Sequence, residues 1–389
     1  MLELVFLLLP VAAGYGYVMG RNSLRQAQRK QSKLLSRHYF KGLNFLLSDQ
    51  PDKAVDSLIK MINLDNDTIE THIAMGNFFR HRGELDRAIR VHQNLIDRDE
   101  IDPEHKEQAL KELGRDYMLA GFLERAEGAY LQLLESDKYY LDAQQQLFNI
   151  YQTTKEWGKA IELAERMMKC RSENEELCQR LSHFYCEKSA LLIANQEIEA
   201  AESLLEKAVM IDDHAVRPWL MLGELAIKNQ QYKQATEYLF EVPKRDAEWL
   251  SEVISSLEHC AEHIDDWSEY ESKLDEHWHS CASAYLSKAR LIASKESIEA
   301  ASQYLADQLK SHPTMKGFDV LLSFYMEQHA GDDVAASLGN LHSLIENQLG
   351  QRPKYRCGNC GFSGKKVHWL CPSCKNWGVI KPIVGLDGE

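Results

Sequence analysis

Apolar and small residues recur between residues 38 and 346 at the spacing of paired helices, and the pattern itself repeats. In the first three copies a glycine is followed three positions later by Phe or Tyr and nine positions after that by an alanine, and the later copies keep the step of nine to the alanine. The alanines of the clear copies are Ala54, Ala88, Ala126, Ala160, Ala201 and Ala235. Weaker copies centre on Ala301 and Val334, and one degenerate unit falls near residues 246–278. These six alanines are 34, 38, 34, 41 and 34 residues apart. A period in this range indicates a repeat architecture, here about nine helical pairs over residues 38–346.

Helix packing explains the pattern. The small residue of the first helix and the alanine of the second should lie where the two helices approach most closely. Turn residues such as His81-Arg82-Gly83-Glu84 separate the helices. Each unit can bury its apolar face only against its neighbours, so the array should form a solenoid.

The best copy is Trp219-x2-Leu222-Gly223-x2-Ala226-x8-Ala235-x3-Leu239. It resembles the tetratricopeptide repeat family. That resemblance implies an all-α solenoid that binds proteins or peptides along a concave groove, and it leaves the partner open.

The N-terminus predicts a membrane anchor. Residues 4–20 contain no charge, and a helix of that length rises about 26 Å, enough for a thin bilayer. A cleaved signal peptide would carry positive charge before the apolar run, whereas here the charge follows it. We therefore expect a transmembrane anchor at residues 1–20. The basic juxtamembrane segment 21–37 should keep the bulk of the chain on the cytoplasmic side of the membrane.

Charge and cysteine usage narrow the function further. The formal net charge is −14, yet residues 21–41 and 352–381 each hold seven Lys or Arg and no acid. An acidic body between two basic ends argues against nucleic-acid binding, which needs a continuous basic face. Of nine cysteines, five are scattered through helical sequence, which suits a reducing compartment.

The C-terminus predicts a metal site. Two CxxC pairs, separated by ten residues, supply the proposed ligands Cys357, Cys360, Cys371 and Cys374. Four thiolates in this arrangement can hold one structural ion, either zinc or iron, and the ion would supply the folding energy of so short a segment. A thioredoxin-type redox pair would need a βαβ context that is absent. His368 is better explained as a surface residue than as a ligand.

This segment, residues 354–389, resembles the rubredoxin and zinc-ribbon group. Lys375 stands where rubredoxins usually have glycine, which argues against electron transfer. The basic residues Lys365, Lys366 and Lys375 favour docking of the segment on the acidic repeats. A freely hanging terminal cap is the alternative.

One catalytic pattern occurs in the chain. His259-Cys-Ala-Glu262-His263 matches the HxxEH arrangement of a class of zinc proteases, but three fixed positions arise easily by chance among 15 histidines. No Gly-rich phosphate loop and no GxSxG elbow is present. We expect a non-enzyme, with a metalloprotease at His259, Glu262 and His263 as a remote alternative. The tryptophans of this region, Trp249, Trp267 and Trp278, are expected to be packing residues.

The order of anchor, repeat array and metal segment resembles the lipopolysaccharide assembly protein B family of Gram-negative bacteria over the whole chain. That resemblance implies a single-pass protein of the inner membrane that regulates lipopolysaccharide synthesis. It further implies that the protein promotes degradation, by the membrane protease FtsH, of the deacetylase that commits to lipid A synthesis. The resemblance also allows a role in gathering lipopolysaccharide-synthesis enzymes. A generic membrane-tethered assembly scaffold is the alternative.

Overall fold

The computed structural model describes residue 19 and residues 69–98, 101–170, 175–276, 281–330 and 333–388. The predicted anchor, the basic segment 21–37, the repeat around Ala54 and Trp278 lie outside the described residues. Among the described residues, no helix is both long enough and apolar enough to cross a bilayer.

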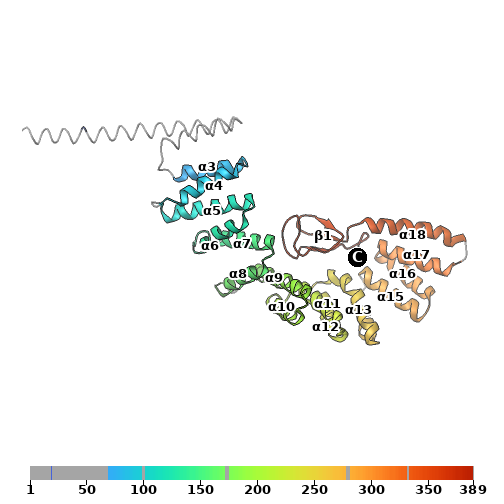
Figure 1. Cartoon of the computed structure of the whole chain (residues 1–389). Coiled ribbons are helices and arrows are strands. Elements are labelled where there is room, and N and C mark those ends of the chain that lie inside the picture. The colour runs from blue at the N-terminus through green and yellow to red at the C-terminus, as the bar shows by residue number, and fades with distance from the viewer. Residues whose placement is uncertain are drawn as a thin grey trace, which may run out of the picture. The chain divides into compact units, whose positions relative to one another are not determined.

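The described chain is almost entirely helical and divides into two units, residues 1–154 and 155–389 (Figure 1). The helices of the first unit are α3 (Ile69–His81), α4 (Leu85–Ile96), α5 (Pro103–Ala120), α6 (Leu123–Leu133) and α7 (Tyr140–Thr154). Those of the second are α8 (Trp157–Cys170), α9 (Glu175–Ala194), α10 (Ile198–Ile211), α11 (Arg217–Lys228), α12 (Tyr232–Arg245), the 3-10 helix η1 (Ala247–Trp249), α13 (Leu250–Ile264), α14 (Ser268–Glu276), α15 (Ala282–Lys295), α16 (Ile298–Ser311), α17 (Met315–Gln328) and α18 (Asp333–Gln351).

The first unit confirms the packing rule of the repeats. A methyl group on Gly76 of α3 would lie 2.2 Å from the ring of His92 on α4, and one on Gly114 of α5 would lie 2.8 Å from Tyr130 on α6. The pattern alanines of the second helices, Ala88 and Ala126, are completely buried. The backbones therefore approach closely because neither contact position carries a bulky side chain.

A buried ionic network joins α3, α4 and α5. His92 Nδ1 lies 2.6 Å from the Asp116 carboxylate, and both side chains are fully buried. The other oxygen of Asp116 accepts a hydrogen bond from Arg80, which also pairs with Glu112. Buried charges are tolerated here because each has an oppositely charged or hydrogen-bonding partner.

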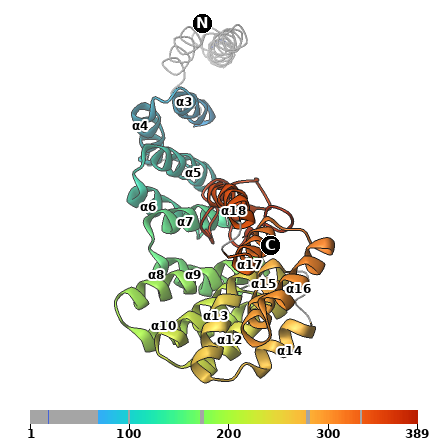
Figure 2. The ribbon, with the colours of Figure 1, turned by 90° about the vertical axis from the view of Figure 1, so that its right-hand side faces the viewer.

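The second unit continues the same pairing. The pattern alanines Ala160, Ala201, Ala235 and Ala301 are completely buried. The region of degenerate sequence forms η1, α13 and α14, and its core residues Val253 and Leu257 join those of α12. Figure 2 shows the helices of this unit following one another along an arc.

The C-terminal segment, residues 354–388, contains a small three-stranded antiparallel sheet, and we call this segment the metal knuckle. Strand β1 (Tyr355–Cys357) lies between β2 (Ser363–Gly364) and β3 (Ile380–Pro382). Its core contains only four buried residues, Tyr355, Cys357, Cys371 and Ile380. Since two of the four are cysteines, the segment has little apolar core of its own.

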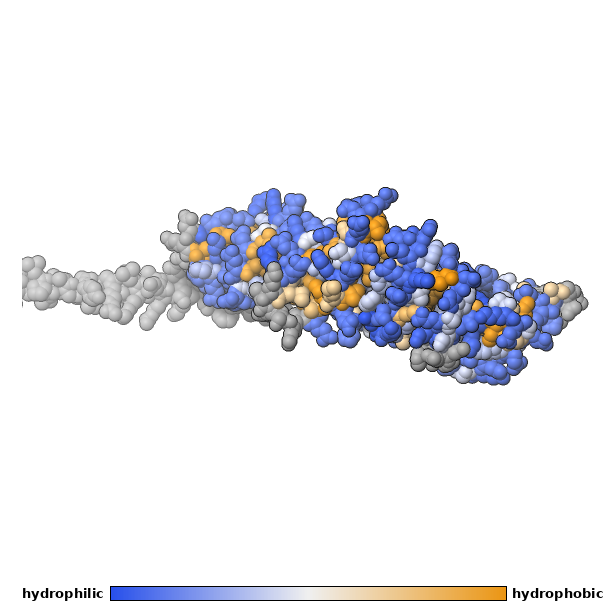
Figure 3. Space-filling view, turned by 90° about the horizontal axis from the view of Figure 1, so that it is seen from below, coloured by the Kyte–Doolittle hydropathy of each residue, from blue (hydrophilic) through white to orange (hydrophobic). Residues whose placement is uncertain are grey.

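The surface visible in Figure 3 is mainly hydrophilic and is broken by separate hydrophobic patches. Large apolar residues that are exposed include Leu119, Met210 and Leu344. Isolated residues of this kind are ordinary on a soluble surface.

Candidate metal centre and its docking surface

The four predicted ligands meet at one point of the metal knuckle. The ligand atoms of Cys357, Cys360, Cys371 and Cys374 all lie within 4.8 Å of one another. Cys357 Sγ is 3.8 Å from Cys374 Sγ, and Cys360 Sγ is 3.7 Å from Cys371 Sγ. Metal–sulfur bonds of about 2.3 Å in a tetrahedron place sulfur atoms about 3.8 Å apart, whereas a disulfide needs about 2.05 Å. The spacing therefore fits one ion with four thiolate ligands.

Matching turns present the two cysteine pairs. Gly361 N donates to Cys357 O at 3.0 Å, and Lys375 N donates to Cys371 O at 2.9 Å. The residue after each pair has a left-handed backbone, with φ of 76° at Gly361 and 59° at Lys375. Lys375, which stands where rubredoxins usually have glycine, is therefore strained, because a left-handed conformation is unfavourable for residues with a Cβ.

Hydrogen bonds and burial act in opposite directions on the thiols. The Asn359 side chain, followed by the Asn376 backbone, lowers the pKa of Cys374 to about 6. A backbone hydrogen bond from Phe362 also lowers the pKa of Cys360, whereas burial raises the pKa of Cys371 to about 11. A bound ion would hold all four groups as thiolates, and four protein ligands leave no open position for a substrate.

Trp377 docks the metal knuckle on α8 and α9. Its ring stacks on His183, with ring centroids 4.8 Å apart, and meets Trp157 and Phe184 edge to face at 6.2 and 6.0 Å. Only 7% of Trp377 remains exposed. Burial of so large a ring, together with about 0.5–1.5 kcal/mol for each aromatic pair, makes this contact a main source of docking energy.

Trp369 makes the second aromatic contact. It stacks on Trp249 at the end of η1, with centroids 4.7 Å apart and planes 11° from parallel. The guanidinium of Arg217, the first residue of α11, lies 5.4 Å from the ring centre of Trp369. Trp249 is therefore a packing residue, as the sequence predicted, and what it packs against is the metal knuckle.

Polar contacts fix the orientation of the metal knuckle. Lys381 Nζ pairs with Asp246 and Glu248 at 2.9 and 2.8 Å. Tyr355 donates its hydroxyl proton to Glu252 of α13 at 2.9 Å. The metal knuckle thus contacts α8 and the first helices of three successive pairs, α9, α11 and α13.

The second cysteine pair and the two docking tryptophans belong to one hairpin. Cys371 and Cys374 lie between Trp369 and Trp377, and Leu370 bridges to Trp377 in antiparallel fashion. Gly378 N donates to Trp369 O at 2.9 Å. Because chelation closes the loop between the two tryptophans, it also fixes the distance between their rings.

Docking occurs, and of the three lysines predicted to favour it Lys365 contributes a contact. Lys365, Lys366 and Lys375 are exposed, and Lys365 donates to Gly350 O at the end of α18. Aromatic stacking and a different lysine, Lys381, hold the metal knuckle on the repeats. Net charge indicated attraction between the parts but contains no information about shape or stacking.

The sequence did contain a signal for this interface. Trp369 and Trp377 flank the second cysteine pair in a segment too small to bury two indoles. On the repeats, His183 and Arg217 are 34 residues apart, which is the repeat period, so they occupy equivalent positions.

The histidine pair of the protease-like pattern does not form a metal site. His259, Glu262 and His263 are exposed, and His263 Nδ1 contacts the His259 carbonyl oxygen at 2.9 Å. His263 also stacks on Tyr232. Within the part of the chain that the structure describes, the only group of three or more clustered metal-ligand side chains is the four cysteines.

Comparison with known proteins agrees with this architecture. The tetratricopeptide repeat model matches residues 71–106 and 192–257, and the rubredoxin metal binding domain model matches residues 355–382. Lipopolysaccharide assembly protein B of Escherichia coli (strain K12) is 40% identical over 391 residues, covering 100% of both chains. The chain belongs to the lipopolysaccharide assembly protein B family.

A second relative of the same name gives the same result. Lipopolysaccharide assembly protein B of Haemophilus influenzae is 37% identical over 401 residues and covers 98% of each chain. Among solved structures, "Structure of Naa15/Naa10 bound to HypK-THB" covers 83% of this chain and 55% of its own, with 13% identity and a TM-score of 0.47. That likeness is too distant to add to the family assignment.

Proposed function

We propose that this chain is a membrane-tethered adaptor for lipopolysaccharide assembly. In this proposal the repeats bind the lipid A-committing deacetylase and the anchor holds the complex beside the membrane protease FtsH, which degrades the deacetylase. The chain itself catalyses no reaction and is located at the inner membrane, with its repeats on the cytoplasmic side.

The observation that carries the proposal is identity of 40% over the full length of a protein named for lipopolysaccharide assembly. The match includes both ends, so it extends to the predicted anchor and to the metal knuckle. Helical repeats present extended surfaces, which suits protein binding. Tethering would raise the effective concentration of the chain near a protease in the same membrane.

The metal centre supports an adaptor because its chemistry is structural. Four cysteine ligands close the coordination sphere, and two tryptophans of the same hairpin pack on the repeats. The bound ion would stabilise a fixed surface that spans the repeats and the metal knuckle. An electron-transfer or hydrolytic role has no comparable support.

Crosslinked co-purification from membranes tests the proposal. The full chain should enrich both the deacetylase and FtsH, and a chain lacking residues 1–20 should lose FtsH because it no longer shares the membrane. Recovery of a different, reproducible membrane complex, without the deacetylase, would replace this proposal by the generic scaffold.

A further inference from the structure

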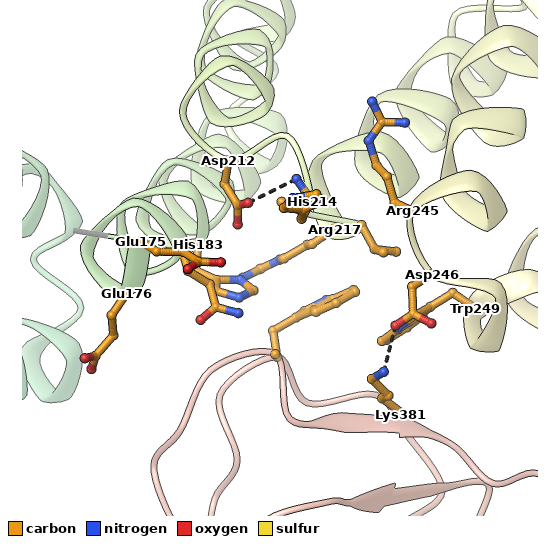
Figure 4. A pocket seen from close by; sticks show the side chains of 15 residues that line it. Glu175, Glu176, His183, Asp212, His214, Arg217, Arg245, Asp246, Trp249 and Lys381 are labelled. Carbon is orange, nitrogen blue, oxygen red and sulfur yellow. Dashed lines mark hydrogen bonds and ion pairs between the residues drawn. The ribbon is translucent and has the colours of Figure 1, made fainter. Parts of the chain in front are cut away.

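A cavity of about 570 Å³ lies where the metal knuckle meets the repeats (Figure 4). Four segments of the second unit line it: α9, the turn from α10 into α11, the region from the end of α12 through η1, and the metal knuckle. Arg217 and His183 line it and are each only 6% exposed, and Trp249 and Trp369, which stack on each other, line it as well. The cavity therefore exists only when the metal knuckle is docked.

Arg217 is the unusual residue of this cavity. Its side chain is only 6% exposed, and Nη2 donates to Glu187 at 2.8 Å. Nε and Nη1 are buried and have no hydrogen-bond partner among the described residues. Leaving donors of a charged group unsatisfied is costly, so the position calls for an additional acceptor.

His183 lies beside Arg217 and adds polarity without charge. It is 6% exposed, and its Nδ1 also lacks a hydrogen-bond partner in the described structure. Burial, reinforced by the charge of Arg217, lowers the pKa of His183 to about 3. The imidazole is therefore neutral near pH 7 and can donate one hydrogen bond to the same acceptor.

Arg217 and the other two cations of the cavity all have acidic partners, but the donors of Arg245 and Lys381 are in use, whereas two donors of Arg217 are not. Arg245 donates through Nε, Nη1 and Nη2 to Asp213 and Glu241, and Lys381 pairs with Asp246 and Glu248. Glu175 and Asp212 also line the cavity. A doubly charged phosphate would face these acids with a single available guanidinium, whereas a carboxylate carries one charge and matches the planar fork of arginine.

We propose that this cavity binds a carboxylate of a partner protein, with Arg217 as the anchoring residue. The carboxylate comes from an acidic side chain or from a chain terminus, and basic or amide groups beside it face Glu175 and Asp212. This inference rests on the proposed function, since it assigns a recognition chemistry to the adaptor surface.

Peptide mixtures test the proposal on the full, metal-loaded chain in detergent. One mixture has the form acetyl-Xaa-Lys-Glu-Lys-Xaa-amide, with Xaa varied over all residues except Asp and Glu. Its match has Gln in place of Glu, and a third mixture has Gln and a free terminal carboxylate. Binding is followed by fluorine NMR of 5-fluorotryptophan at Trp249 and Trp369, assigned with Trp249→Phe and Trp369→Phe. At least one of the two carboxylate mixtures should shift these signals. A shift with the Glu mixture indicates a side-chain carboxylate, and a shift with the free-terminus mixture indicates a terminal carboxylate.

Two arginines of the same cavity provide a matched control. Arg217→Gln should weaken binding at least tenfold, whereas Arg245→Gln, which removes the same charge from a fully bonded arginine, should change it less than threefold. Arg217→Lys keeps a cation beside Glu187 but loses the planar fork, so it should also weaken binding tenfold. If Arg217→Gln loses its metal or its helical structure, as measured by circular dichroism, Arg217→Lys takes its place as the test of the Arg217 contact.

Three results would overturn the proposal. The Glu and Gln mixtures could bind equally while the free terminal carboxylate adds nothing, no mixture could shift the fluorine signals, or Arg217→Gln and Arg245→Gln could weaken binding equally. Inorganic phosphate that shifts the signals while no carboxylate mixture does would also overturn it. Failure here would leave co-purification of the deacetylase and FtsH unchanged, so it is distinguishable from failure of the proposed function.

Discussion

Close approach of paired helices depends on single residues without bulk. Gly76 faces His92 so tightly that a methyl group would lie 2.2 Å from the imidazole, whereas Gly128 on α6 has nothing within 4 Å of the same position. The two glycines are therefore opposite cases within one unit, in agreement with the repeat pattern, which places Gly76 but not Gly128 at a helix contact.

Gly76→Ala should destabilise α3 and α4 by about 1–3 kcal/mol, because His92 and its ionic network with Asp116 must shift. Gly128→Ala should stabilise α6 by about 0.5–1 kcal/mol, because alanine favours a helix and meets no neighbour. Hydrogen exchange of the amides in these helices measures both effects. Equal responses in the two variants would contradict the assigned close contact.

Lys375 carries the strain of the second cysteine turn. Lys375→Gly should remove the strain of the positive φ. After the entropic cost of the more flexible glycine is subtracted, the metal-bound turn should be more stable by about 0.7 kcal/mol. This corresponds to metal binding about threefold tighter, measured by chelator competition. Lys375→Gln removes the same charge but keeps the Cβ. If it tightens binding as much as glycine does, charge and not backbone strain is the cause.

At the scale of elements, the repeats were largely predictable, and so was docking of the metal knuckle, but the contacts that hold the metal knuckle were not. The pattern alanines Ala88, Ala126, Ala160, Ala201 and Ala235 are all fully buried, because helix contact imposes a local and periodic demand on the sequence. The stacking of Trp369 on Trp249 joins residues 120 positions apart, and no periodicity encodes such a contact. A prediction from charge therefore names exposed lysines, although Trp369 and Trp377, which make the aromatic contacts, stand beside the second cysteine pair in the sequence.

The same interface changes what loss of the metal should do. Cys371→Ser should release the ion and unfold the metal knuckle, because metal binding supplies on the order of 10 kcal/mol to such small folds. Trp369 and Trp377 should then leave their positions on the repeats. Metal analysis should find less than one ion per chain. Hydrogen exchange should rise at His183, Trp249 and the metal knuckle.

The effect of Cys371→Ser should end near the docking surface. Helices α3 to α6 belong to the first unit, and each repeat is stabilised mainly by its nearest neighbours, so their exchange should stay unchanged. Retention of one tightly bound ion would contradict the four-cysteine site. Loss of the ion without any change at Trp249 would contradict its coupling to docking.

At the scale of the whole molecule, three parts act together in the proposed adaptor. The predicted anchor restricts the chain to the membrane, the repeats provide the binding surface, and the metal knuckle completes that surface within the second unit. Trp377→Ala separates these contributions, because it leaves all four cysteines in place and removes a ring that contacts Trp157, His183 and Phe184. Truncation of a buried aromatic ring typically costs about 3–5 kcal/mol, so the variant should weaken docking of the metal knuckle strongly.

The most direct test is the half-life of the lipid A-committing deacetylase in cells whose only copy of this protein is the wild type, Trp377→Ala or a chain lacking residues 1–20. Each variant must be present at the wild-type level, and Gly128→Ala serves as the control substitution. The proposed function predicts a half-life several times longer with Trp377→Ala and with the truncated chain, and an unchanged half-life with the control. A wild-type half-life with both altered chains would contradict an adaptor that depends on its anchor and its docked metal knuckle.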